Sequence, residues 1–168
     1  MTFLSKTILV VAGLALAACS NPDRFDESGS ASANANASIA GTAQDPTSPL
    51  YFQQAVGDRV LFEVDQSNLS PTATATLDGQ ALWLMRNADY NAVIEGHADE
   101  QGTREYNVAL GARRANSVQE YLITKGVAAS RLKVVSYGKE RPIEICSEEA
   151  CYAKNRRAVT VISAGPTS

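Results

Sequence analysis

The chain has 168 residues, and its 15 lysines and arginines nearly balance its 18 aspartates and glutamates, which gives a net charge of −3. This balance does not favour a nucleic-acid partner, because binding to phosphates requires clustered positive charge. The length suffices for one domain of ordinary size with one core, and not for two. We therefore expect a single folded domain with additional segments.

Residues 1–18 have the features of a secretory signal peptide. Lys6 is followed by an apolar run from Thr7 to Ala18, which is too short for a membrane-spanning helix and ends in small residues. The last residues of the run, together with Cys19, resemble the lipobox of bacterial lipoproteins, in which the cysteine sulfur is lipidated before cleavage. The alternative is an ordinary signal peptide beside a chance cysteine. The lipobox resemblance implies that Cys19 becomes the acylated first residue, and Ser20 in place of aspartate implies the outer membrane.

Residues 19–49 are expected to form a lipidated N-terminus and a flexible tether. This segment is rich in Ser, Ala, Asn, Gly and Pro, and its only sizeable apolar side chains are Phe25 and Ile39. Such a segment cannot bury enough surface to offset the entropy cost of ordering it. Two or more acyl chains would hold its end firmly in a membrane, since each buried methylene contributes roughly 0.8 kcal/mol.

The remaining segment, residues 50–168, alternates strand-like and helix-like patterns and is expected to be the folded domain. The first predicted strand covers residues 59–64, with the sequence RVLFEV. A helix follows from Ser70, a typical cap, and Pro71 at the first helical position. Its predicted buried side consists of four residues at helical spacing, Leu77, Ala81, Leu84 and Met85.

The second half of the domain repeats this alternation. A strand is predicted over residues 90–96, and a long helix is predicted from about Arg104 to Lys125, where Gly126 ends it. Further predicted elements are a strand over 131–137, a short helix over 148–155 and a last strand over 157–162. The apolar face of the long helix is expected to contain Val108, Ala112, Ala115, Val118 or Gln119, and Leu122. This order predicts a two-layer α+β fold of βαβαβ type, with helices packed on one face of a small mixed sheet.

Two cysteines remain once Cys19 is assigned to lipid. In an exported chain, Cys146 and Cys151 are expected to form a disulfide. By chain entropy a short loop of this kind gains roughly 2 kcal/mol. Metal binding by the pair alone is disfavoured, because a structural zinc takes four ligands and no histidine lies near.

Three stretches of the domain carry a family signature: EGHADEQGTREYNVALGARRANSVQEYL, VVSYGKERP and AKNRRAVTV. Together they closely resemble the OmpA-like peptidoglycan-binding domain, and the resemblance extends from about Val56 to Ile162. Several separated motifs in the same order make the resemblance specific. The loop between the two cysteines departs from the family pattern, and so does Val64, where a larger apolar or aromatic residue is common.

The resemblance implies a ligand, the diaminopimelate residue of the peptidoglycan stem peptide, whose free end carries an ammonium and a carboxylate. Asp99 would bind the ammonium, and Arg114 would bind the carboxylate, since a guanidinium matches a carboxylate with two parallel hydrogen bonds. Asn107 lies seven positions before Arg114 on nearly the same helix face. Gly111 between them would leave room for the ligand. Asp65, after the first strand, matches another position near the ligand in relatives.

Other charged residues near these motifs have less specific interpretations. Without the family resemblance, Asp99 and Arg114 would be interpreted as a surface salt bridge worth about 0–1 kcal/mol. Arg113 is expected to be solvated or structural, because neighbouring helix residues point in different directions. The stretch from Asn155 to Arg157 is expected either to form a basic rim or to anchor the last strand.

An enzyme is the competing class of protein, and His97, Asp99 and Glu100 are the residues that would support it. His97 is the only histidine in the chain, whereas a catalytic zinc normally takes three protein ligands. The HExxH and GxSxG motifs and phosphate-binding glycine loops are absent from the sequence. We therefore expect no catalytic residue, no metal and no cofactor, and we expect His97 to fix its loop as a hydrogen-bond donor.

The resemblance instead implies a non-enzymatic anchor between the outer membrane and peptidoglycan. It further implies roles in envelope integrity and cell division as part of the Tol-Pal system. TolB, the periplasmic propeller protein of that system, is the implied protein partner. An adaptor that acts mainly through TolB, or a peptidoglycan hydrolase, is the alternative.

Overall fold

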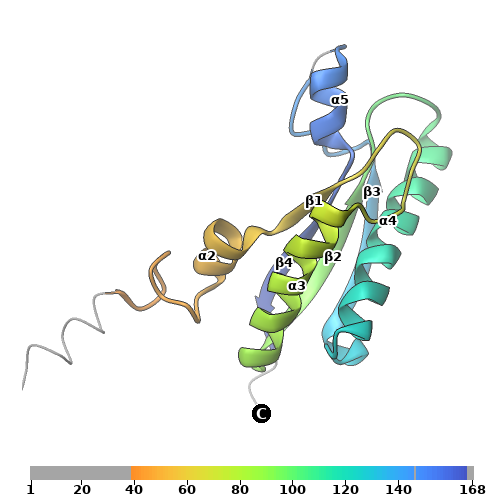
Figure 1. The fold of residues 1–168 in the computed structure, drawn as a ribbon. Helices are drawn as coiled ribbons and strands as arrows, with labels where there is room; N and C mark the ends of the chain where they lie inside the picture. Colours follow the sequence, from red (N-terminus) through yellow and green to blue (C-terminus); the bar gives the residue numbers. More distant parts are fainter. Residues whose placement is uncertain (1–38, 146, 166–168) are drawn as a thin grey trace, which may run out of the picture.

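The computed structural model describes residues 39–145 and 147–165 of the chain (Figure 1). The predicted signal peptide, Cys19, most of the predicted tether and Cys146 lie outside these residues. Within the described ranges, no helix combines the length and hydropathy needed to cross a membrane.

A four-stranded sheet forms one layer of the domain, in the order β1-β4-β2-β3. β4 pairs antiparallel with both β1 and β2, whereas β2 and β3 are parallel. The strands are β1 (Arg59–Leu61), β2 (Tyr90–His97), β3 (Leu132–Gly138) and β4 (Arg157–Ala164). The mixed sheet is thus confirmed, and its parallel pair is joined by a helical crossover, as parallel strands require.

Two long helices, α3 (Pro71–Arg86) and α4 (Arg104–Thr124), form the second layer on one face of the sheet (Figure 1). This arrangement confirms the predicted α+β fold. α5 lies beyond one end of the sheet (Figure 1). The shorter elements are α2 (Pro49–Tyr51), the π-helix η1 (Phe52–Gly57), the 3₁₀ helix η2 (Ala129–Arg131) and α5 (Glu149–Asn155).

The ends of the long helices follow from local sequence. The hydroxyl of Ser70 accepts a hydrogen bond from the backbone N–H of Ala73 at 3.1 Å, and Thr103 caps α4 in the same way through Tyr106 at 3.2 Å. Gly126 follows α4 with a φ of 104°, the left-handed conformation that glycine adopts most readily. Both predicted helices are confirmed.

The core lies between the sheet and the two helices, and its position corrects two predicted helix faces. Leu77, Ala81 and Leu84 of α3 are buried, but Met85 is 45% exposed, because a step of about 100° from Leu84 turns it toward solvent. On α4 the buried side chains include Leu110, which was not predicted. Val108 and Ala112 of the predicted face are only partly buried, since the helix is rotated to place polar residues inward.

The first strand is shorter than predicted. β1 ends at Leu61, and Val64 is 53% exposed. Beyond Phe62 the chain turns toward α4, and Asp65 has a φ of 58°. Residues 62–64, which the apolar pattern of residues 59–64 assigned to the strand, therefore belong to the β1–α3 loop, residues 62–70.

The chain packs against α3 from Pro46 onward, within the segment predicted as a tether. The indole Nε1 of Trp83 donates to the carbonyl oxygen of Pro46 at 2.8 Å. Phe52 is buried against the same indole, with 4.9 Å between ring centroids. Ordered packing of this segment thus depends on one aromatic side chain of α3.

Candidate ligand-binding site

A hollow of about 270 Å³ lies between the β1–α3 loop, the β2–α4 loop and the first turns of α4. Three of the four residues predicted to bind the ligand, Asp65, Asp99 and Asn107, line this hollow. The complete lining is Val64, Asp65, Asp99, Gln101, Gly102, Tyr106, Asn107 and Leu110. The fold therefore brings residues separated by up to 46 positions in sequence, from Val64 to Leu110, to one place.

Arg114, the fourth predicted residue, is completely buried on α4. Its Nε donates to the carbonyl oxygen of Gln66 at 2.8 Å, its Nη1 to that of His97 at 2.8 Å, and its Nη2 to that of Glu63 at 3.1 Å. One guanidinium thus ties the β1–α3 loop and the end of β2 to α4.

The charge of Arg114 is retained at neutral pH. Burial lowers the pKa of this guanidinium to about 10, the nearby Asp99 acts in the opposite direction, and Arg156 lowers it further. Of the five N–H donors of an arginine, three hold carbonyl oxygens here. Arg114 therefore supplies a positive potential next to the hollow while it maintains the loops that form it.

Asp99 follows β2 and is only 8% exposed. One carboxylate oxygen, Oδ2, accepts from Nη1 of Arg156 at 3.1 Å, and Oδ1 accepts from the backbone N–H of Gln101 at 3.3 Å. Its ion-pair partner is thus Arg156 and not Arg114. Sequence reasoning noted Arg156 only as a rim or anchor residue, because only the fold shows that the start of β4 lies beside the β2–α4 loop.

Asp65 and Asn107 shape the hollow through different bonds. Asp65 accepts a hydrogen bond from the hydroxyl of Tyr106 on α4, which connects the β1–α3 loop to the helix. Asn107 is buried, and its Nδ2 donates to the carbonyl oxygen of Gln101 at 2.8 Å, which holds the β2–α4 loop. Tyr106 was not singled out from the sequence, since an exposed tyrosine on a helix gives no specific signal.

The expected role of Gly111 as an open approach for the ligand is wrong. A Cβ at this position would lie 2.5 Å from Oγ of Ser136 and 2.8 Å from the carbonyl oxygen of Gly96. The missing side chain therefore allows α4 to approach β2 and β3, and not a ligand to approach α4.

His97 also differs from its prediction. Its ring is 2% exposed, and within the described chain neither ring nitrogen has a hydrogen-bond partner, so it does not fix its loop as a donor. Burial, together with the positive charges of Arg157 and Arg141, lowers its pKa to about 4. The main chain of His97 has the positioning role instead, because its carbonyl oxygen binds Arg114.

Other features bear on metals, disulfides and charge. Among the described residues, no group of three or more His, Cys, Asp or Glu side chains is arranged to hold a metal ion. Cys151 is disulfide-bonded, whereas Cys146 lies outside the described residues.

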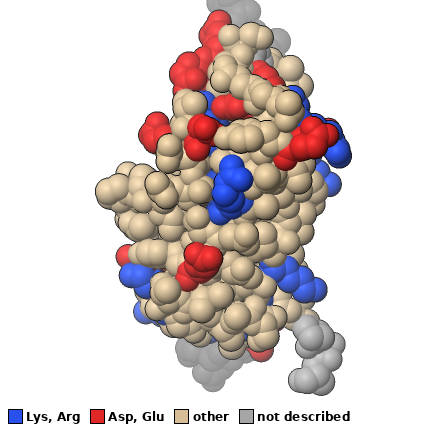
Figure 2. Space-filling view, turned by 90° about the vertical axis from the view of Figure 1, so that its right-hand side faces the viewer, with Lys and Arg blue, Asp and Glu red and all other residues tan. Residues whose placement is uncertain are grey.

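On the side of the molecule shown in Figure 2, acidic and basic side chains are interspersed, mainly in the upper part, and uncharged surface covers most of the rest.

Comparison with known proteins agrees with this fold. The model of the OmpA family matches residues 61–156. The peptidoglycan-associated lipoprotein of Mesorhizobium japonicum is 47% identical over 157 residues, which cover 93% of this chain and 90% of the relative. That of Rhizobium meliloti is 44% identical over 156 residues, which cover 92% and 85%.

Solved structures give the same result. The peptidoglycan-associated lipoprotein from Burkholderia pseudomallei superposes with a TM-score of 0.64 at 36% identity, over 72% of this chain and 98% of that chain. The C-terminal domain of Helicobacter pylori MotB, at 22% identity and a TM-score of 0.60, over 65% and 86% of the two chains, shares the fold.

The chain therefore belongs to the OmpA family and shares its fold with a solved member of the peptidoglycan-associated lipoproteins. Within this family it is one of the peptidoglycan-associated lipoproteins, which match it over nearly its whole length. Both groups are non-enzymatic, in agreement with the expectation that the chain is not an enzyme.

Proposed function

We propose that this protein binds peptidoglycan non-covalently by holding the free end of a diaminopimelate side chain in the hollow at Asp99. The observation that supports this most directly is the placement of Asp65, Asp99 and Asn107 around one hollow beside the buried cation Arg114. A zwitterionic ligand end requires one fixed anion and one fixed cation, and both are present here. The names of the relatives support peptidoglycan as the polymer.

The two charges act differently in this proposal. The Asp99 carboxylate lines the hollow and accepts the ligand's ammonium directly, because a carboxylate has about four acceptor positions and the protein uses two. Arg114 has no exposed surface, so the ligand's carboxylate contacts it only after the loop carbonyls of Glu63 and Gln66 shift. Before that shift, the positive charge of Arg114 attracts the ligand's carboxylate through its electrostatic field.

The proposed anchor at the other end is the outer membrane. Residues 1–18 are removed as a signal peptide, Cys19 is acylated, and residues 19–49 link it to the domain at 50–168. Cys146 is the proposed disulfide partner of Cys151. Many tethered domains on one polymer act multivalently, so weak single contacts suffice to hold the membrane to the wall. Roles in the Tol-Pal system, binding of TolB, envelope integrity and cell division belong to the same proposal and rest on the family resemblance.

The test is calorimetric titration of the full chain in detergent with a stem peptide that contains diaminopimelate. Asp99→Asn removes the proposed anion and keeps the shape of the side chain, and we expect affinity to fall by at least about tenfold, the effect of one hydrogen bond to a charged group. Asp78→Asn is the matched control, because Asp78 lies on α3 and pairs with Lys125 at 2.7 Å. The control is expected to bind as the unsubstituted chain does.

Equal binding by Asp99→Asn and the unsubstituted chain would contradict the proposed site. Arg114→Ala is a poor test of ligand contact, because it would also release three loop carbonyls.

A further inference from the structure

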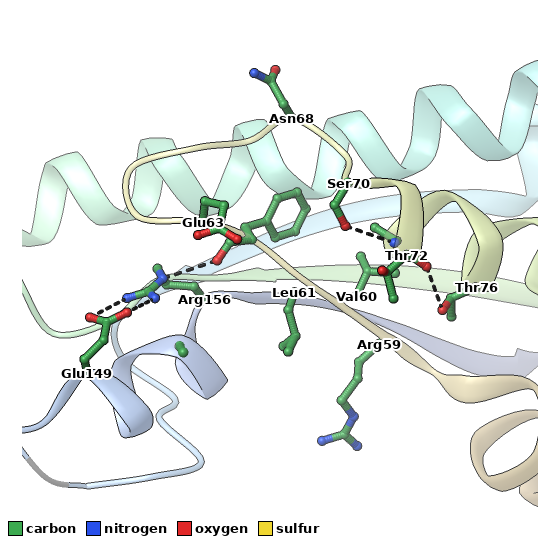
Figure 3. Close-up of a pocket in the computed structure, with 13 residues that line it drawn as sticks. Arg59, Val60, Leu61, Glu63, Asn68, Ser70, Thr72, Thr76, Glu149 and Arg156 are labelled. Atoms are coloured by element: carbon green, nitrogen blue, oxygen red, sulfur yellow. Dashed lines mark hydrogen bonds and ion pairs between the residues drawn. The ribbon is translucent and has the colours of Figure 1, made fainter.

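Arg156 occupies a position that the proposed function leaves unexplained. This arginine lies between α5 and β4 and is only 3% exposed. It lines a groove of about 560 Å³ along β1, bordered by α3 and α5 (Figure 3). Its Nη1 also donates to the carboxylate of Asp99, which lines the hollow. Arg156 therefore lines the groove and reaches the hollow only through Asp99, because the groove and the hollow have no lining residue in common.

Three acceptors from different parts of the fold fix the plane of the Arg156 guanidinium. Its Nε donates to the carbonyl oxygen of Phe62 at 3.2 Å, and its Nη1 donates to Oδ2 of Asp99 at 3.1 Å. Its Nη2 donates to the carboxylate of Glu149, which also lies 3.4 Å from Nη1 (Figure 3). A lysine could not satisfy these three directions at once, because an ammonium is a single point of contact.

This arrangement fixes Asp99 in turn. The carboxylate is held on Oδ2 by Arg156 and on Oδ1 by the N–H of Gln101, so its orientation does not depend on the ligand. Binding groups that are already oriented lose less entropy when a ligand arrives. Asp99 remains able to accept further hydrogen bonds.

Glu149 has a complementary electrostatic role. Asp99 has two buried cations near it, Arg114 and Arg156, and two cations would oppose the arrival of a ligand ammonium. Glu149 offsets one of them. Its side chain is 67% exposed, so it balances the charge of Arg156 without being part of the core.

We infer that Arg156, balanced by Glu149, is a positioning residue that gives the hollow its selectivity for a ligand end bearing an ammonium group. The inference rests on the proposed function. It adds the reason why the site binds a ligand end with an amine more tightly than one without it. Arg156 itself does not contact the ligand in this arrangement, and it acts through the orientation of Asp99.

The experiment compares two stem peptides on the full chain in detergent. One contains diaminopimelate, and the other contains 2-aminopimelate, which keeps the side-chain carboxylate and lacks the ammonium. In Arg156→Lys, we expect affinity for the first peptide to fall about tenfold and affinity for the second to stay within about twofold, as for the loss of one charge-assisted hydrogen bond. The preference of the chain for the first peptide over the second is therefore largely lost.

Arg157→Lys is the matched control, because Arg157 is also buried and bonds to backbone oxygens of Asn155 and Arg141. It is expected to keep that preference even if it lowers the melting temperature. Glu149→Gln is expected to weaken binding of the ammonium-bearing peptide about two- to fivefold at low salt, and less at high salt, because the contact is exposed.

The outcomes separate this inference from the proposed function. If the unsubstituted chain binds neither peptide, or binds both equally, the ammonium site at Asp99 is wrong and the inference is overturned with it. If the unsubstituted chain prefers the ammonium and Arg156→Lys keeps that preference, or loses both peptides equally, the proposed function stands and the positioning role of Arg156 is refuted.

Discussion

Two glycines set the closest contact between the sheet and α4. A Cβ placed on Gly96 of β2 would overlap the carbonyl oxygen of Gly111 on α4 and would lie 3.1 Å from Cβ of Ala115. These obstacles belong largely to backbone, which cannot rotate away as a side chain can. The distance between β2 and α4 at the base of the ligand site thus depends on the absence of two side chains.

Gly96→Ala is expected to lower the free energy of unfolding by at least about 2 kcal/mol, because the added methyl overpacks a rigid contact. Gly79→Ala is the control. Its Cβ would meet only Cγ1 of Val56 at 3.5 Å, an ordinary contact, so alanine should stabilise α3 by about 0.5–1 kcal/mol. Urea denaturation of both variants measures the difference, and a Gly96→Ala variant as stable as the parent would refute the interpretation.

The sequence could not assign the role of Gly111 correctly. Gly111 lies between Asn107 and Arg114, and the spacing alone is compatible with an opening toward a ligand or with contact to a strand. Which one applies depends on the rotation of α4, and that rotation is set by tertiary packing of Leu110 and Ala115. Three of the four predicted site residues line one hollow, but their hydrogen-bond partners were not foreseeable without the conformations of the loops.

Asn155 fixes the backbone at Ile143 and Glu144 in the segment between β3 and α5. Asn155, the last residue of α5, is completely buried. Its Oδ1 accepts from the backbone N–H groups of Ile143 at 2.9 Å and Glu144 at 3.2 Å, and its Nδ2 donates to the carbonyl oxygen of Glu144 at 2.8 Å. The sequence suggested either a basic rim or anchoring of the last strand for this stretch, whereas these contacts of Asn155 hold the segment that precedes α5.

Asn155→Ala is expected to release this segment while leaving the sheet intact. Hydrogen–deuterium exchange of the amides of Ile143 and Glu144 should accelerate, and stability should fall by roughly 1–3 kcal/mol, because backbone groups lose buried partners. Asn68→Ala, at an exposed position of the β1–α3 loop, should change neither quantity measurably. Unchanged exchange in Asn155→Ala would show that other contacts hold the segment.

Elements with long periodic patterns were predicted well from sequence, and irregular ones were not. α3, α4 and the four strands were each located within a few residues, since caps, a terminal glycine and β-branched runs mark them. The π-helix η1 and the packing of Pro46 on Trp83 had no local signal. Both depend on an aromatic contact made across the fold.

At the scale of the whole molecule, His97 makes folding stability depend on pH. Its buried ring lies 5.6 Å from the ring of Tyr137, with Nε2 3.7 Å from Oε2 of Glu95, and the cations Arg157 and Arg141 act on it. Its pKa is about 4 in the folded chain, whereas an unperturbed histidine has a pKa of 6.5, so the unfolded chain binds the proton first as pH falls. The contribution of neutral His97 is therefore complete above pH 6.5 and is lost between 6.5 and 4.

His97→Phe keeps a ring of similar shape and removes the titrating group. Between pH 7 and pH 4 the unsubstituted chain should lose about 3 kcal/mol more stability than this variant, an order-of-magnitude figure from the pKa difference. Chemical denaturation at several pH values measures both curves. Parallel curves would mean that the buried ring does not resist protonation.

The strand order has a consequence for the timing of folding. Within the described chain β1 pairs only with β4, and β4 also separates β1 from β2. When the chain emerges with its N-terminus first, β1 therefore remains unpaired until residues 157–164 follow. Until then α3 also lacks part of the sheet on which it packs. Pairing of strands so distant in sequence is slow to nucleate. The domain thus stays open until nearly all of it has been delivered, and its unpaired segments remain accessible to proteases until its final strand inserts.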